Sequence, residues 1–145
     1  MTTPFSLEDR WASTTGHVTG LALLFMSAGM LVSAIVGLVA GSAGLALLGA
    51  TAITAFLGIG LSWTTRPGAL DHATVFTAVG GTWVAASMVG TLPYLLAGTF
   101  AVAGRPWTVV VADALFESIS GYTATGSTVF GSHNPIADQG AGILL

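Results

Sequence analysis

The sequence predicts an all-α membrane protein, because three long apolar runs dominate a chain that carries very little charge. Only 6% of its 145 residues are charged, and the mean hydropathy is +0.85. A soluble domain carries about 25% charged residues. The chain therefore lacks the polar surface that covers a soluble globule, and the lipid bilayer is its expected partner.

Each apolar run is long enough to cross a hydrocarbon core, which takes about 20 helical residues. The runs cover residues 18–40, 43–63 and 73–96. Little more than Gly41 and Ser42 separates the first two, so residues 18–63 are expected to form a transmembrane helical hairpin. Pro93 is expected to bend the third helix or to end it soon afterwards.

Small residues recur at four-residue spacing in the first run, at Gly29, Ser33, Gly37 and Gly41. Such a ridge lets another helix approach closely. We expect it to serve tight packing within the protein.

The three arginines predict the orientation through the positive-inside rule. An N-terminus in the cytoplasm, formed by residues 1–17, puts Arg10 and Arg66 inside and leaves only Arg105 outside. The expected location is the cell (plasma) membrane, with several passes.

Other classes of function find little support. The net charge is −3 and no basic cluster occurs, which argues against nucleic-acid binding. There is no cysteine, and His17, His72 and His133 are isolated, so neither a metal site nor a cofactor is expected. No serine, histidine and acid arrangement indicates hydrolysis, and we expect no enzyme.

Residues 108–120 are too short and too polar to cross the bilayer. They carry Asp113 and Glu117 four residues apart, on one face of a helix that is expected to stop at Gly121. The next residues, 122–128, are uncharged and rich in hydroxyl groups. Non-helical backbone at membrane depth is tolerated where it is buried in protein or lines a watery cavity. The pattern predicts a re-entrant pore helix followed by a loop.

The composition of this loop suits an alkali cation. A dehydrated potassium ion needs a ring of oxygen ligands, and backbone carbonyls supply them without the deep trap that a carboxylate makes. Glycine permits the backbone angles that aim carbonyls inward. A phosphate-binding P-loop is the rival interpretation of Gly121-x-x-x-x-Gly126-Ser127-Thr128, but its lysine is missing and it follows a helix instead of a strand.

Residues 113–129, D-A-L-F-E-S-I-S-G-Y-T-A-T-G-S-T-V, resemble the first pore loop of the Trk/Ktr/HKT potassium-transporter superfamily. The usual form of that loop is close to D-A-x-F-E-x-x-S-G-[LFY]-T-T-T-G-A-T. Residues 90–96, G-T-L-P-Y-L-L, resemble the Leu-Pro-Phe ending of its outer helix. The preceding hairpin resembles the additional helix pair of the bacterial TrkH branch.

The resemblance implies four helix, pore-loop, helix repeats around a central pathway. Residues 73–145 would then be the first repeat, truncated at the start of its inner helix near residues 140–145, and the chain an N-terminal fragment. Gly126 matches the filter glycine, which goes with potassium more than with sodium. The carbonyls of Ala124 and Thr125 match the ion-facing positions, and Thr123 and Ser127 flank them.

Asp113, Glu117 and Thr128 are expected to support this filter. Asp113 is interpreted as a cap or dipole partner in the first helical turn, in preference to an ion-attracting charge at the outer mouth. Glu117 is expected to brace the loop by hydrogen bonding, in preference to contacting ions.

The resemblance also implies partners: the remaining repeats, a second copy in a homodimer, and a cytoplasmic nucleotide-binding regulatory subunit. Potassium is then the transported ion. The alternative is a non-conducting membrane protein, either a truncated relic or a helix-packing module.

Overall fold

The described part of the chain is entirely helical. The computed structural model describes residues 7–68 and 71–130, and these contain five helices and no strand. The helices are α1 (Leu7–Val39), α2 (Gly44–Thr64), α3 (His72–Gly90), α4 (Leu92–Leu96) and α5 (Trp107–Tyr122).

Three stretches are long and apolar enough to cross a membrane: Ala12–Val39, Gly44–Thr64 and His72–Leu96. The predicted all-α class and the three apolar spans are confirmed. Many large apolar side chains point outward from these helices, among them Phe25 and Phe56. Lipid tails are as apolar as these side chains, so their exposure to a bilayer costs little free energy.

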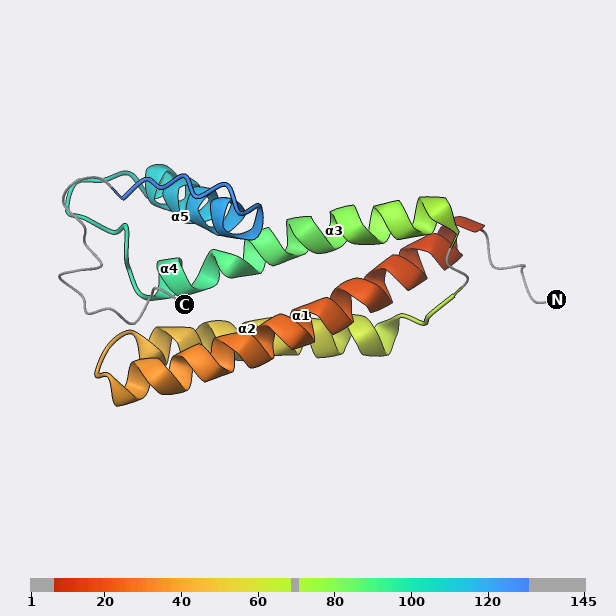
Figure 1. The fold of residues 1–145 in the computed structure, drawn as a ribbon, viewed down its shortest axis with the longest axis horizontal. Coiled ribbons are helices and arrows are strands. Elements are labelled where there is room, and N and C mark those ends of the chain that lie inside the picture. Colours follow the sequence, from red (N-terminus) through yellow and green to blue (C-terminus); the bar gives the residue numbers. More distant parts are fainter. Residues whose placement is uncertain (1–6, 69–70, 131–145) are drawn as a thin grey trace.

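Helices α1 and α2 form the predicted hairpin and lie side by side (Figure 1). Gly41 makes the turn in the left-handed region at φ +69°, and the Ser42 N–H closes it by donating to the Gly37 carbonyl at 2.9 Å. Helix α1 extends beyond the apolar run that begins at residue 18, because it starts at Leu7. Part of the segment assigned to the cytoplasmic N-terminus is therefore helical, and its side of the membrane stays a prediction.

Helices α1 and α2 approach each other closely at both ends of the hairpin: near the turn, a Cβ atom at Gly44 would stand 2.9 Å from the Ala34 carbonyl oxygen, and the open end is as tight. A Cβ atom at Gly20 would stand 2.7 Å from the Ser62 nitrogen and 2.9 Å from the Gly58 carbonyl oxygen. By contrast, a Cβ atom at Gly29 would meet nothing within 4 Å. The predicted ridge of small residues therefore packs tightly in part: a Cβ atom at Gly37 would stand 3.1 Å from Gly44, whereas the Gly29 position is open.

Helix α3 packs along α1, where the Thr19 and Thr82 hydroxyl groups lie 3.1 Å apart. It ends at Gly90, and the short helix α4 follows with Pro93 at its start. The break precedes the proline because its ring excludes the carbonyl one turn earlier and it has no N–H to donate. The predicted effect of Pro93 is confirmed.

Gly58 and Gly60 provide a matched test of the α1–α2 seam. A Cβ atom at Gly58 would meet the Gly20 carbonyl oxygen at 2.9 Å, whereas one at Gly60 would meet nothing within 4 Å. We expect Gly58→Ala to destabilise the protein by about 1–3 kcal/mol, as overpacking does. Gly60→Ala should leave stability equal or higher, since alanine is the better helix former. Thermal unfolding in detergent measures both, and equal losses would contradict the seam.

The start of α3 provides a test that depends on pH. Asp71 caps the helix, and its Oδ1 accepts the Thr74 N–H at 2.8 Å. The Thr74 hydroxyl and this N–H lower the pKa of the Asp71 carboxyl below its usual value of 3.8. Because the folded pKa is depressed, the stabilisation is present above the unfolded pKa and is lost as pH falls through the folded pKa.

Asp71→Ala should therefore lower the melting temperature at pH 7, and the deficit should shrink below about pH 4. Asp71→Asn is the control, because asparagine keeps the cap without the titration. A deficit of Asp71→Ala that stays constant down to pH 3 would count against the charged cap.

Candidate functional site

Helix α5 is anchored on the last part of α3 by a small-residue contact. A Cβ atom at Gly90 would overlap the Ser118 hydroxyl oxygen and stand 2.8 Å from a ring carbon of Tyr122. The Ser118 hydroxyl also donates to the Ser87 carbonyl at 2.7 Å. Glycine at residue 90 thus lets the end of α5 lie directly against α3.

The other end of α5 is tied by an ion pair. Asp113 Oδ2 accepts from Arg105 Nη2 at 2.5 Å, and both side chains are partly exposed. Asp113 lies in the second turn of α5, and the first turn holds no acidic residue. The expectation of a first-turn cap was wrong, because α5 already begins at Trp107 and the Asp113 carboxylate pairs with Arg105 instead. Asp113 therefore steadies the start of α5 and has no contact with the loop.

After α5 the chain turns back to the end where the helix began. The Phe130 ring stacks on Phe100, which precedes α5, with ring centroids 5.0 Å apart. Figure 1 shows the blue segment running back along α5. The helix ends at Tyr122 instead of at Gly121, and the Thr123 N–H caps it on the Ile119 carbonyl at 2.9 Å. The loop therefore starts one residue later than predicted.

Two residues of the loop have left-handed backbone conformations. Thr123 has φ −84°, Ala124 φ +52° and Gly126 φ +69°. A Cβ atom at Gly126 would meet nothing within 4 Å, so glycine is needed there for its backbone angle and not for space. Ala124 holds the left-handed region without that freedom, and residues in such conformations cluster at functional sites.

Glu117 ties the far side of the loop to α5. Its Oε1 accepts the Thr128 hydroxyl and the Val129 N–H, each at 2.6 Å. The Thr128 oxygen in turn accepts the Phe130 N–H at 3.1 Å. The bracing hydrogen bonds predicted for Glu117 and the supporting position of Thr128 are present, whereas any role in ion passage stays a prediction.

Side-chain hydrogen bonds hold the near side of the loop as well. The Thr123 and Thr125 hydroxyl oxygens lie 2.6 Å apart. The Ser120 hydroxyl donates to the Ser127 carbonyl at 2.6 Å, and the Ser120 carbonyl accepts the Thr125 N–H at 3.1 Å. Sequence reasoning missed Ser120, although the residue is part of the motif, because its partners depend on how the loop folds back.

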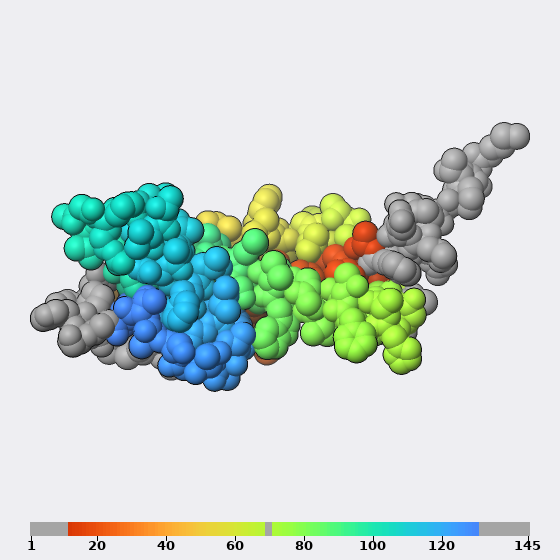
Figure 2. Space-filling model, turned by 90° about the horizontal axis from the view of Figure 1, so that it is seen from above, coloured from red at the N-terminus to blue at the C-terminus, as the bar shows by residue number. Residues whose placement is uncertain are grey.

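The loop leaves a short row of carbonyl groups unused. Within the described residues, the carbonyl oxygens of residues 123–126 accept no hydrogen bond, whereas that of Ser127 does. These residues are exposed, and Figure 2 shows the deep-blue segment at the surface beside α3, drawn in green. The arrangement therefore offers oxygen ligands and no charged group, which suits a weakly bound alkali cation.

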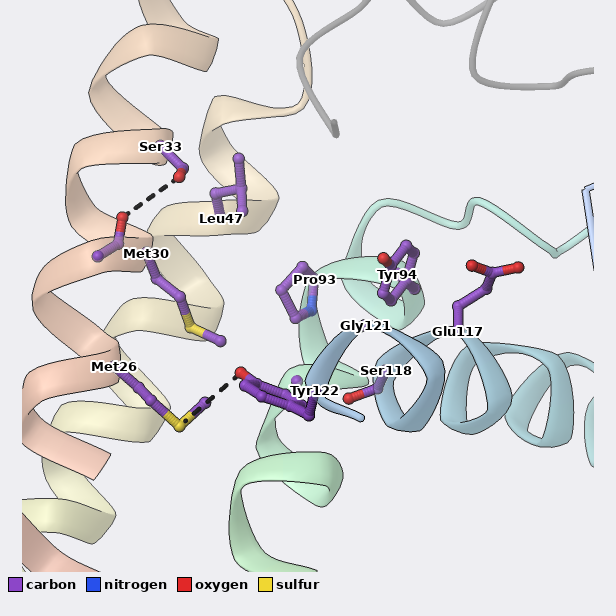
Figure 3. A pocket seen from close by; sticks show the side chains of 12 residues that line it. Met26, Met30, Ser33, Leu47, Pro93, Tyr94, Glu117, Ser118, Gly121 and Tyr122 are labelled. Carbon is purple, nitrogen blue, oxygen red and sulfur yellow. Dashed lines mark hydrogen bonds between the residues drawn. The ribbon is translucent and has the colours of Figure 1, made fainter. Parts of the chain in front are cut away.

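A groove of about 440 Å³ separates the hairpin from the α4–α5 unit. Figure 3 shows Met26, Met30 and Leu47 on one side and Pro93, Tyr94 and Tyr122 on the other. Gly29 and Ser33 also line this groove, which explains why a Cβ atom at Gly29 would meet no neighbour. Sequence reasoning assigned none of these residues to a cavity.

The histidines do not gather at the loop. His17 Nδ1 lies 3.2 Å from the Ser62 carbonyl oxygen, at the open end of the hairpin. His133 and the expected inner helix at residues 140–145 lie outside the described residues. In the described part of the chain, no three His, Cys, Asp or Glu side chains are grouped so that they could hold a metal ion.

No family model, curated protein or solved structure matches the chain. The resemblance to the Trk/Ktr/HKT superfamily therefore depends on the residues quoted above.

Removing the Glu117 carboxylate tests the brace directly. We expect Glu117→Ala to speed amide hydrogen exchange at Val129 about tenfold or more, because a hydrogen bond to a charged group is lost. Glu117→Gln keeps one acceptor oxygen and should give an intermediate rate. Asp113→Ala is the matched control, since it removes a carboxylate one turn earlier on the same helix without touching the loop. Exchange at Val129 that is equal in Glu117→Ala and Asp113→Ala would contradict the brace.

Proposed function

We propose that this chain takes part in potassium transport across the membrane and supplies one quarter of the selectivity filter of a Trk-type uptake system. Residues 123–127 form the filter segment, with Gly126 at its centre. The observation that carries the proposal is the row of carbonyl groups at residues 123–126 that no described residue bonds to, in a loop that hydrogen bonds hold on both sides.

The course of α5 supports this proposal. The helix has 16 residues, and at a rise of about 1.5 Å per residue it covers about 24 Å, less than the hydrocarbon core. The chain enters and returns at one end, because Phe130 stacks on Phe100. A segment with this course in a bilayer is a re-entrant loop, which is tolerated only against protein or a watery cavity.

The electrostatics of the loop favour a cation. The C-terminal end of α5 leads directly into the loop, and the partial negative charge of a helix C-terminus attracts cations. Carbonyl dipoles replace the hydration shell of potassium and still release it, as conduction requires. Among the described residues, the carboxylate that bonds to the loop is that of Glu117, and it is engaged by Thr128 and Val129. The groups that the loop offers to an ion are therefore carbonyl dipoles and not a free carboxylate.

A single loop makes one side of a filter, so a complete ring requires further repeats. The resemblance implies that they belong to the same protein, that the protein is a homodimer in the cell membrane with its N-terminus in the cytoplasm, and that a cytoplasmic nucleotide-binding subunit regulates it. These features belong to the proposal.

Gly126→Asp tests the filter. The substitution puts a side chain and a charge where the backbone is left-handed, so we expect the complete protein to lose its support of growth at limiting potassium in an uptake-deficient host. Gly104→Asp is the matched control: Gly104 has φ +83° and open space around its Cβ position, but lies before α5. It should retain growth. Full growth with Gly126→Asp would refute the filter, and a parent protein that gives no growth at limiting potassium would favour the non-conducting module.

A further inference from the structure

Ser120 holds the loop on both sides of Gly126. It lies in the last turn of α5 and is only 6% exposed. Its hydroxyl donates to the Ser127 carbonyl at 2.6 Å, and its carbonyl accepts the Thr125 N–H at 3.1 Å. The residue before the central glycine and the residue after it are therefore attached to one position of the helix.

The Ser120 hydroxyl also determines where the row of free carbonyl groups ends. The carbonyls of residues 123–126 are unbonded within the described residues, and the Ser127 carbonyl is the first one bonded to α5. Glu117 acts further along, on Thr128 and Val129. Loss of the Ser120 hydroxyl would leave the Ser127 carbonyl without its partner and free to turn.

We propose that Ser120 is a positioning residue that sets the discrimination between potassium and sodium, because it keeps the Ser127 carbonyl out of the ion pathway. This inference rests on the proposed function of the loop. Selectivity among alkali cations depends on the number, geometry and field strength of the oxygen ligands. A fifth movable carbonyl at the end of the row changes that set, and a flexible set accommodates the smaller sodium ion as well.

The test compares Ser120→Ala with Ser118→Ala in the complete protein. Both serines are buried in α5, at 6% and 5% exposure, and both hydroxyl groups donate to a carbonyl, but Ser118 bonds to Ser87 on α3. We expect Ser120→Ala to lower the ratio of potassium to sodium uptake about 2- to 10-fold, the change that one hydrogen bond supplies. Maximal potassium uptake should persist, and Ser118→Ala should keep the parent ratio.

Ser120→Thr retains the hydroxyl and should keep the parent ratio of potassium to sodium uptake. A fall in Ser120→Ala that came from altered packing alone would appear in Ser120→Thr as well. If Ser120→Ala fails to accumulate, Ser120→Cys, a weaker donor of similar size, decides the question through an intermediate ratio. The inference would be overturned if Ser120→Ala kept the parent ratio of potassium to sodium uptake, or if Ser118→Ala lowered this ratio equally. Failure of the proposed function is distinguishable, because the parent protein would then show no potassium uptake for Gly126→Asp to abolish.

Discussion

The two hydrogen bonds to one oxygen of Glu117 are the constraint on which the loop depends. Backbone that leaves a helix in an apolar medium must find partners for its N–H groups, since water is not there to supply them. A carboxylate is suited to this task because it only accepts hydrogen bonds and makes stronger ones than a neutral group. By accepting from both the Thr128 hydroxyl and the Val129 N–H, Glu117 attaches the returning segment to α5.

That brace works only if α5 itself is held in place, and three contacts hold it. Arg105 pairs with Asp113 near its start, Ser118 bonds to α3, and Gly90 leaves room for the Tyr122 ring. The contacts lie at different positions along the helix, so the loss of one still leaves two that hold α5 in place. The position of the loop is thus a consequence of how α5 packs.

The helical spans could be predicted from the sequence because hydropathy is local and the bilayer sets the length. The extension of α1 to Leu7 could not, since a helix that continues into a polar segment has no such signal. The need for a left-handed residue at Gly126 follows from its type, whereas alanine at residue 124 gives no hint of the same conformation. The partners of Asp113 and Ser120 escaped prediction because each depends on a turn that brings distant residues together.

The unbonded carbonyl groups also bear on the choice between a filter and a packing module. In a module surrounded by lipid, every carbonyl without a partner costs free energy, and the carbonyls of residues 123–126 have no partner among the described residues. The hydroxyl groups that could have satisfied them are used elsewhere: Thr123 and Thr125 on each other, Ser120 on Ser127, and Thr128 on Glu117. Such a division of partners leaves the row open to water or ions, and this favours the filter.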